Sequence, residues 1–473
     1  MQKRTKIVAT IGPATETEEV IEQLIEAGMN VARFNTKHGT PEWHLERIKR
    51  VKNVAKRMNV GIGILLDLQG PEIRINLPDQ KPFEVVENEE VLFADEKLAE
   101  DSRPKSDKLI LIPANVIETL QDGHLILLDD GLCEFEVVGH RDGALVTKAL
   151  GDFPVKHRKT MNIPGVTVDM PSLIPADLVQ LDNMTDADID FVGLSFVRDK
   201  ADIAILRSEL KKRNLHADII AKIENQAALD NLDEIIEVSD AVMVARGDLA
   251  VEVAFEQLTY WQKMIIAKSR LAGKPVITAT QMLKSMVDQP RPTRAEVSDV
   301  AHAVYDSTSA VMLSEETTIG KYPVKAVATQ AKIAAYNEQF VETQLGTWID
   351  NDNTAAITHT AIDLLTHSQQ PIDQVICLTE TGYSAKLLAR FCPAIIVKAV
   401  TSTDQTYAKL ALVYGVEAHK MDWSKINSED SSELVAYFKE LKLVAAGQTV
   451  LLIYGSVFKK SGFTNSLSLL KVE

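Results

Sequence analysis

Eight short apolar runs alternate with amphipathic segments along most of the chain. The runs are almost continuously hydrophobic, which is typical of parallel strands that are covered on both faces. The segment after the first run begins with threonine, carries early acidic residues and stops at Gly28, as helices do. The eight runs lie at residues 6–12, 30–35, 61–68, 189–196, 218–224, 241–247, 275–281 and 309–316.

Eight strand–helix units predict an α/β fold built on a (β/α)₈ barrel, which we assign to residues 1–70 and 166–344. A doubly wound open sheet has the same alternation of strands and helices. The periodicity leaves that alternative open.

Residues 71–165 interrupt the alternation after the third run. Short strand-like pieces separated by Asp-Gly turns predict a small all-β domain. Because the insertion leaves from the carboxyl end of a barrel strand, we expect it to cover that face as a lid. The pieces lie at 83–94, 109–116, 124–138 and 144–150, with turns at 122–123, 130–131 and 142–143.

Residues 345–473 predict a second α/β domain with a regulatory or oligomerisation role. A helical segment comes first, and the last two strand-like runs are candidates for an antiparallel pair. The predicted strands lie at 374–380, 394–401, 416–421, 449–455 and 466–472.

Charge and cysteine content narrow the function classes. The net charge of −16 argues against nucleic acid or an anionic membrane as partner, although it allows a local cationic pocket. Cys133, Cys377 and Cys392 are too few and too scattered for a disulfide framework or a zinc site. The N-terminal apolar run is too short for a signal peptide, and no run reaches the roughly 18 residues of a membrane span. We therefore expect a cytoplasmic protein.

Polar side chains stand at the carboxyl ends of seven of the eight predicted strands, where barrel enzymes keep their active sites. Charge that faces into a barrel must be paired or bound to something. The residues are Arg33, Asn35, Asp67, Ser195, Lys222, Glu224, Asp248, Thr280 and Ser314.

Glu224 and Asp248 are hard oxygen ligands on neighbouring strands, and they suit Mg²⁺ or Mn²⁺. Lys222 lies two residues from Glu224, so both side chains point the same way, and Arg33 adds a second cation. Together these groups predict an anion pocket suited to phosphoryl transfer. An ion-paired barrel floor is the structural alternative. No G-x-x-x-x-G-K-[ST] loop is present, which excludes a P-loop nucleoside triphosphatase.

Eight segments resemble the pyruvate kinase family, in the family's order and over nearly the whole chain. The resemblance implies a glycolytic kinase that moves phosphate from phosphoenolpyruvate to ADP, uses Mg²⁺ or Mn²⁺, and forms a homotetramer. The segments are TKIVATIGPAT, MNVARFN, LLDLQGPEIR, AKIEN, MVARGDLAVE, ITATQML, RPTRAEVSDVA and VMLSEET.

The resemblance also implies roles for the reacting centre. Glu224 and Asp248 resemble the divalent-metal ligands that also hold phosphoenolpyruvate. Lys222 is similar to the lysine that bridges the phosphoryl group in flight and stabilises the enolate. Thr280 resembles the threonine that helps deliver the proton, through water. The backbone at Gly247 would lie against the substrate carboxylate.

The remaining site residues are implied in the same way. Arg33 is implied as a catalytic and substrate-binding residue, and Ser195 as substrate-binding. Asn35, His38 and Arg74 resemble nucleotide-binding positions. Two alternatives stay open here: another metal-dependent enolate-forming barrel enzyme, such as a lyase or phosphomutase, and a non-catalytic sensor with this fold.

Three positions depart from the family pattern. Ala250 stands where glycine is usual, and Glu315 stands where a small residue is usual. Ala176 lies near a position that carries a nucleotide-binding lysine in many members. These departures put the nucleotide preference in question.

The C-terminal domain carries a candidate effector loop. Thr379, Thr381, Gly382 and Ser384 resemble a family loop that binds an effector phosphate at a helix N-terminus. Glu380 places a negative charge inside it, and residues 454–462 also depart from the family's effector segment. We therefore expect weak or altered sugar-phosphate activation. A purely structural link to a tetramer is the alternative.

Lys37 stands in a region where most family members bind a potassium ion. The resemblance places Asn35 and Asp67 in that cation site, but Lys37 replaces a serine and Leu68 a threonine. Glu72 is the residue of potassium-dependent members. We expect the Lys37 ammonium to reach the anionic pocket beside Asp67 and Glu72 and to make potassium unnecessary.

The alternative for Lys37 is a solvated side chain that pairs with Glu42 or Glu46 on the following helix.

Overall fold

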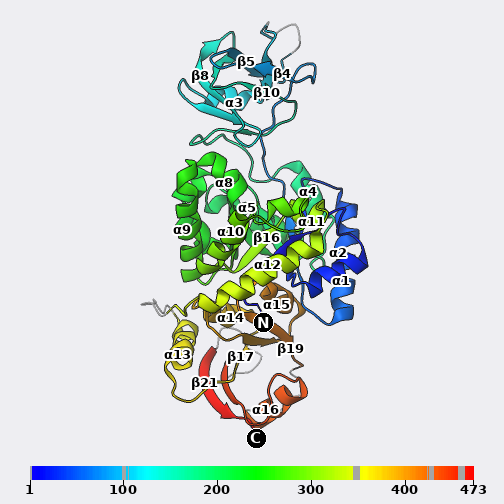
Figure 1. Ribbon diagram of the computed structural model, residues 1–473, viewed down its shortest axis with the longest axis vertical. Helices are drawn as coiled ribbons and strands as arrows, with labels where there is room; N and C mark the ends of the chain where they lie inside the picture. The colour runs from blue at the N-terminus through cyan, green and yellow to red at the C-terminus, as the bar shows by residue number, and fades with distance from the viewer. Residues whose placement is uncertain are drawn as a thin grey trace.

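Three bodies follow one another along the long axis of the molecule, as the computed structural model shows (Figure 1). It describes residues 3–98, 103–104, 106–344, 352–422, 424, 431–455 and 464–473. The inserted β-rich unit lies at one end, the barrel in the middle and the C-terminal sheet at the other end.

The middle body is a closed barrel of eight parallel strands, in the order β1-β16-β15-β14-β13-β12-β3-β2. The predicted barrel is therefore confirmed, and the doubly wound alternative is wrong. All eight strands fall within the predicted apolar runs, and their side chains are buried along most of their length. The strands are β1 (Lys6–Thr10), β2 (Val31–Asn35), β3 (Gly63–Asp67), β12 (Phe191–Leu194), β13 (Asp218–Ile223), β14 (Ala241–Ala245), β15 (Val276–Ala279) and β16 (Ala310–Leu313).

Helices pack around the barrel and bury its outer face. Local sequence sets several of their ends: the hydroxyl of Thr40 caps α2, Pro41 occupies its first turn, and Asn59 ends it in the left-handed conformation. The helices are α1 (Glu18–Glu26), α2 (Pro41–Met58), α4 (Pro175–Asp182), α5 (Lys200–Lys212), α6 (Gln226–Asp230), α7 (Leu232–Val238), α8 (Arg246–Glu252), η2 (Phe255–Gln257), α9 (Leu258–Leu271), η3 (Lys284–Val287), α10 (Arg294–Tyr305), α11 (Glu315–Thr318), α12 (Pro323–Asn337) and η4 (Glu338–Phe340).

The insertion forms a six-stranded sheet and a two-stranded sheet around its own apolar cluster. Asp142 and Gly143, both at positive φ, turn the chain between β8 and β9 as predicted. The prediction of a strand over 109–116 was wrong at its end, because Pro113 stops it and a short helix follows. The elements are β4 (Phe83–Val85), β5 (Glu90–Asp95), β6 (Leu109–Ile112), α3 (Ala114–Thr119), β7 (Leu125–Leu128), β8 (Cys133–Arg141), β9 (Ala144–Ala149), β10 (Phe153–Val155) and β11 (Met161–Asn162).

The C-terminal body is a five-stranded sheet in the order β19-β18-β17-β20-β21. Its last two strands are antiparallel, as predicted. Most of the predicted second effector segment, residues 456–462, lies outside the described residues. The elements are α13 (Asn353–His367), β17 (Gln374–Leu378), α14 (Tyr383–Ala389), β18 (Val397–Thr401), α15 (Asp404–Lys409), η5 (Leu410–Leu412), β19 (Val416–Lys420), α16 (Ser431–Glu440), β20 (Thr449–Gly455) and β21 (Thr464–Lys471).

The direction of the barrel strands decides where a site can form. All eight strands run the same way, so their carboxyl ends gather at the end from which the insertion leaves, after β3. The C-terminal body attaches at the opposite end, where Lys6 Nζ donates to the Val416 carbonyl at 2.6 Å. Among the described residues, no helix is long and apolar enough to cross a membrane.

Candidate active site

Lys222 is the central cation at the carboxyl end of the barrel. Its side chain and that of Glu224 leave β13 on the same side, as the two-residue spacing predicted. Lys222 Nζ lies 2.9 Å from Glu224 Oε1 and 3.4 Å from Asp67 Oδ1. It also donates a hydrogen bond of 2.7 Å to Ser195 Oγ. Four predicted side chains from the ends of three strands therefore meet in one buried cluster.

Arg33 holds Asp67 from the other side. Arg33 Nε and Nη2 both reach Asp67 Oδ2, at 2.7 and 2.6 Å, and Nη1 donates to Thr10 Oγ1 at 2.9 Å. Asn35 and Asp67 are partners in the register of β2 and β3, which aligns the ends of these strands. Asp67 thus lies between two cations and is almost completely buried.

The charges in this cluster set one another's protonation. Burial alone would raise the pKa of Asp67, but Lys222 and Arg33 hold that pKa below its usual value. Burial would likewise lower the pKa of Lys222, but Asp67 and Glu224 raise it. Burial raises the pKa of Glu224, and Asp248 adds to that rise. Lys222 is consequently a fixed ammonium at neutral pH.

The sequence placed Asp248 at the end of a strand, and this prediction was wrong. Strand β14 stops at Ala245, and Asp248 lies in the first turn of helix α8, because the chain turns into a helix directly at Arg246. Its carboxylate faces a cavity of 180 Å³ that it shares with Phe196, Asn225 and Glu252.

The cavity also reaches the insertion. Asn162 of β11 lines it and donates to Glu252 Oε1 at 3.2 Å. Burial raises the pKa of Glu252 to about 6. Neither Asn162 nor Glu252 was identified from the sequence, because nothing in either local segment marks a contact between residues 90 positions apart.

The donor set fits a hard divalent cation. Glu224 and Asp248 come from adjacent strand–helix units, and the charge of Asp248 contributes to the raised pKa of Glu224. Within the described part of the chain, no group of three or more His, Cys, Asp or Glu side chains is arranged to hold a metal. Two carboxylates completed by substrate and water are the sparse set that Mg²⁺ takes in phosphoryl-transfer sites.

Thr280 and Gly247 lie together beside this cluster. A Cβ added at Gly247 would lie 3.6 Å from Thr280 Cγ2, which is an ordinary contact. The protein itself therefore does not require glycine at this position. Thr280 has φ +70°, a conformation that β-branched residues rarely adopt.

The three residues predicted to bind the nucleotide make separate contacts and do not form one group with the Lys222 cluster. Asn35 Oδ1 accepts from the Lys37 backbone N–H at 3.2 Å. Arg74 pairs with Glu72 at 2.7 Å and donates to the Arg158 carbonyl of the insertion at 2.9 Å. The His38 side chain is exposed. The structure thus links Arg74 to the returning part of the insertion but does not bring His38 to the buried cluster.

Lys37 turns inward rather than toward the following helix. Its Nζ lies 3.1 Å from Glu72 Oε1 and 5.8 Å from the centre of the Phe196 ring. The Glu72 side chain is only 7% exposed. Glu46, one of the two alternative partners, pairs instead with Arg47 and Arg50.

The backbone next to Lys37 and Asp67 is connected to the Lys222 cluster. The Leu68 carbonyl accepts a hydrogen bond of 2.7 Å from Ser195 Oγ, which in turn accepts from Lys222.

Two of the departures from the family pattern lie on the surface. Glu315 pairs with exposed Lys284, and Ala176 is exposed on α4.

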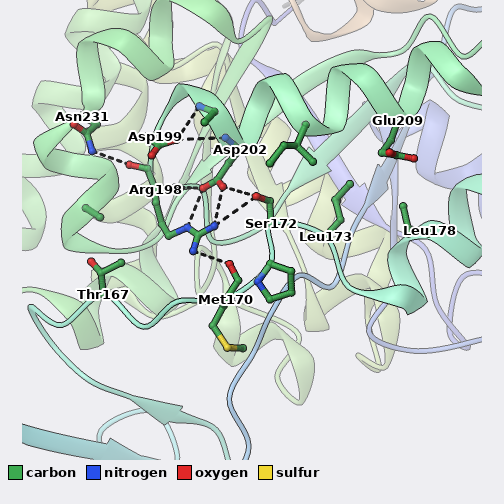
Figure 2. A pocket seen from close by; sticks show the side chains of 14 residues that line it. Thr167, Met170, Ser172, Leu173, Leu178, Arg198, Asp199, Asp202, Glu209 and Asn231 are labelled. Carbon is green, nitrogen blue, oxygen red and sulfur yellow. Dashed lines mark hydrogen bonds and ion pairs between the residues drawn. The ribbon is translucent and has the colours of Figure 1, made fainter. Parts of the chain in front are cut away.

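Arg198 lies three residues after Ser195 and lines the cavity of Asp248. It also lines a second cavity, of 730 Å³, where it donates to the Met170 carbonyl and to both oxygens of Asp202 (Figure 2). Ser172 donates to the same carboxylate. These bonds fix the segment that returns from the insertion to the outside of the barrel.

The candidate effector loop is internally bonded. Gly382 has φ +79° and donates its N–H to Thr379 Oγ1 at 3.0 Å. Ser384 Oγ shares a hydrogen bond of 2.7 Å with Thr464. Glu380 accepts from Ser402 Oγ at 2.8 Å.

Comparison with known proteins decides the family. A family model described as "Pyruvate kinase, barrel domain" matches residues 2–327, and one described as "Pyruvate kinase, alpha/beta domain" matches residues 355–470. The chain belongs to the pyruvate kinase family. The resemblance seen in the sequence is confirmed, and the lyase, phosphomutase and sensor alternatives are not supported.

Individual pyruvate kinases match over nearly the whole chain. That of Geobacillus stearothermophilus is 39% identical over 479 residues, which are 98% of this chain and 80% of that protein. That of Bacillus licheniformis is 38% identical over 476 residues, 98% of this chain and 79% of that protein. The crystal structure of a pyruvate kinase from Cryptosporidium parvum superimposes with a TM-score of 0.90 at 30% identity, covering 100% of this chain and 96% of the other.

A substitution of Gly193 should disturb the cluster without removing any charge. A Cβ at this position would lie 2.8 Å from Asp67 Oδ1, so Gly193→Ala should displace the carboxylate from Arg33 and Lys222. Overpacking of this kind costs about 1–3 kcal/mol. The unfolding temperature measured by calorimetry should fall, and the rate of pyruvate formation should fall as well. Gly151→Ala is the control, since its nearest neighbour would be 3.8 Å away; equal behaviour of the two variants would contradict the argument.

Proposed function

We propose that this site transfers the phosphoryl group of phosphoenolpyruvate to ADP, giving pyruvate and ATP, with a divalent cation held by Glu224 and Asp248. The observation that carries the proposal is the buried Lys222 ammonium, held between Asp67 and Glu224 at the end of the barrel from which the insertion leaves. An ammonium in this position offers preorganised positive charge to a group whose negative charge is moving.

The proposed roles follow from the contacts. Arg33 and Lys222 bind and orient the phosphoryl group, and Ser195 keeps Lys222 in place through its 2.7 Å hydrogen bond. When bound, the divalent cation supplies further positive charge to the phosphoryl oxygens. The bond from phosphorus to the enol oxygen breaks as a bond to the terminal ADP oxygen forms. Lys222 then stabilises the enolate that remains.

The second step protonates that enolate. Thr280 delivers a proton to carbon three through water, and the enolate becomes the ketone of pyruvate. Gly247 supports this assignment, since the protein leaves room for a side chain there and a bound carboxylate would use that room. The insertion, linked to the site through Arg74 and Asn162, would exclude water from the phosphoryl group.

Removal of the central cation tests this function. Lys222→Ala should lower kcat by about 10²–10³, the cost of losing one preorganised charged donor, while affecting phosphoenolpyruvate binding far less. Lys200→Ala is a suitable control because the Lys200 side chain is exposed and forms a surface ion pair with Glu234. A Lys222 variant with a near-normal turnover number would refute the assignment. A coupled assay without ADP should show no pyruvate.

We further propose that Lys37 substitutes for a monovalent cation. Its ammonium lies against the buried Glu72 carboxylate, and its charge contributes to the lowered pKa of Asp67. Two unit charges about 4 Å apart interact with roughly 4 kcal/mol at an effective dielectric constant near 20. A covalently attached cation in this position leaves little electrostatic gain for a free potassium ion.

Activity in different salts tests this role. In tetramethylammonium or sodium buffers the protein should be fully active, and added potassium should change little. Lys37→Ser should lower activity in those buffers, since Glu72 loses its cationic partner. Lys49→Ser, on the exposed side of α2, is the control. An absolute potassium requirement in the unmutated protein would refute the proposal that Lys37 substitutes for a monovalent cation.

Effector binding is proposed to be weak. The hydroxyls of Thr379 and Ser384 are already hydrogen-bonded within the C-terminal body, and Glu380 adds a negative charge to the same loop. Fructose 1,6-bisphosphate should therefore shift the phosphoenolpyruvate concentration for half-maximal velocity only slightly. Strong activation that is lost in Ser384→Asp would contradict this expectation.

We also infer that the chain assembles into a homotetramer. Four large aromatic side chains on the outside of the barrel are more than half exposed, which supplies apolar surface for a second copy. They are Phe255, Tyr260, Tyr336 and Phe340.

A further inference from the structure

The backbone at Thr280 is strained. Thr280 and Gln281 have φ +70° and +54°, so two successive residues other than glycine are left-handed. Such conformations cost on the order of 1–3 kcal/mol each and persist only where the surroundings enforce them. Something near the end of β15 must therefore hold this turn.

Arg246 makes the contacts that can do so. Its Nε donates to the Ala279 carbonyl at 3.1 Å, and its Nη2 donates to the Thr280 carbonyl at 2.7 Å. The guanidinium thus holds the peptide groups on both sides of the Thr280 Cα. The Arg246 side chain is only 11% exposed, which restricts its movement.

Asp299 holds the guanidinium in turn. From helix α10 it accepts two hydrogen bonds from Arg246, at 2.6 and 2.8 Å, in the bidentate geometry that fixes both planes. Gln262 of α9 accepts a third, at 3.2 Å. Arg246 also begins helix α8, so the residue that restrains Thr280 lies next to Gly247 and two positions before Asp248.

The guanidinium also bears on the Thr280 hydroxyl. Thr280 Oγ1 donates to the Ala279 carbonyl at 2.6 Å, the same oxygen that accepts from Arg246 Nε. One arginine therefore holds both the backbone of Thr280 and the carbonyl oxygen to which its hydroxyl donates.

We propose that Arg246 and Asp299 form a positioning pair that holds Thr280 in its strained conformation for the protonation of the enolate. The inference rests on the proposed function, in which Thr280 delivers that proton. In this step the electron pair of the carbon–carbon double bond takes a proton at carbon three, relayed from Thr280 through water, while the enolate oxygen becomes the ketone. Solvent restores the proton to Thr280.

The test separates proton transfer from phosphoryl transfer. By the reverse of the protonation step, the full-length protein with Mg²⁺ should exchange the methyl hydrogens of pyruvate for deuterium, and NMR in D₂O follows the rate. Arg246→Lys keeps the charge but cannot span two carbonyls and a carboxylate. Asp299→Asn keeps the shape but weakens the pair. Both variants should exchange about 10²-fold more slowly, as expected for a misplaced reacting group.

A second measurement excludes a general loss of structure. The Mn²⁺ affinity, measured by electron paramagnetic resonance, and the KM for phosphoenolpyruvate should stay near the unmutated values in both variants. Arg207→Lys is the matched control, since Arg207 also bonds a carboxylate and a carbonyl, those of Asp240 and Val238, at the opposite end of β14. Exchange in Arg207→Lys should be normal.

Three results would overturn the proposal. Normal methyl exchange in Arg246→Lys is one, and a parallel loss of Mn²⁺ affinity, which would assign the pair to the stability of α8, is another. The Thr280→Val variant distinguishes a failure of the positioning pair from a failure of the proposed role of Thr280. If it exchanges slowly while Arg246→Lys is normal, only the positioning pair is wrong. If Thr280→Val is normal, the proposed role of Thr280 fails, and with it the reason for the pair.

Discussion

Asp67 is the group on which the arrangement of the site depends. Lys222 and Arg33 are two buried cations that would repel each other across the end of the barrel, and Asp67 lies between them. A buried charge without a partner is strongly destabilising, so each of the three requires the others. The Asp67 backbone carbonyl adds to this role by accepting from both the N–H and the hydroxyl of Thr36, which fixes the loop leading to Lys37. Lys222 is thus placed by a carboxylate and by the loop that this carboxylate's residue holds.

The barrel topology explains why these charges meet at all. Parallel strands bring all their carboxyl ends to one rim, and the insertion leaves from that rim after Asp67. The same rim carries Glu72 and Arg74 at the start of the insertion and Asn162 near its end. Glu72 and Arg74 are therefore close in the chain to Asp67, and Glu72 and Asn162 contact Lys37 and Glu252. Arg198 holds the segment that returns from the insertion through its bond to the Met170 carbonyl (Figure 2).

The sequence was sufficient to predict the structural features that depend on the spacing of residues close together in the chain. Continuous apolar runs gave all eight strands, and the two-residue interval between Lys222 and Glu224 correctly placed both side chains together. The prediction was wrong about where two strands end. Asp248 lies in a helix rather than at a strand end, and Pro113 stops a strand that was predicted to continue. Contacts such as Asn162 with Glu252 could not be predicted, because they depend on how two bodies pack rather than on any local pattern. The inward direction of Lys37 was expected from the resemblance to the family's cation site, and in the structure its ion-pair partner is Glu72.

The positioning pair also gives a physical reason for three segments that appeared as separate motifs. Arg246 comes from MVARGDL, Thr280 from ITATQ and Asp299 from RPTRAEVSDVA, and all three meet at one guanidinium. A planar fork with five N–H donors can satisfy two carbonyls and a carboxylate at once, which no other side chain can do. The strain at Thr280 is thereby balanced by charge-assisted bonds within the barrel, and it need not be relieved by substrate. A strained residue supported in this way is already in position when the enolate forms, so its reorganisation adds nothing to the barrier.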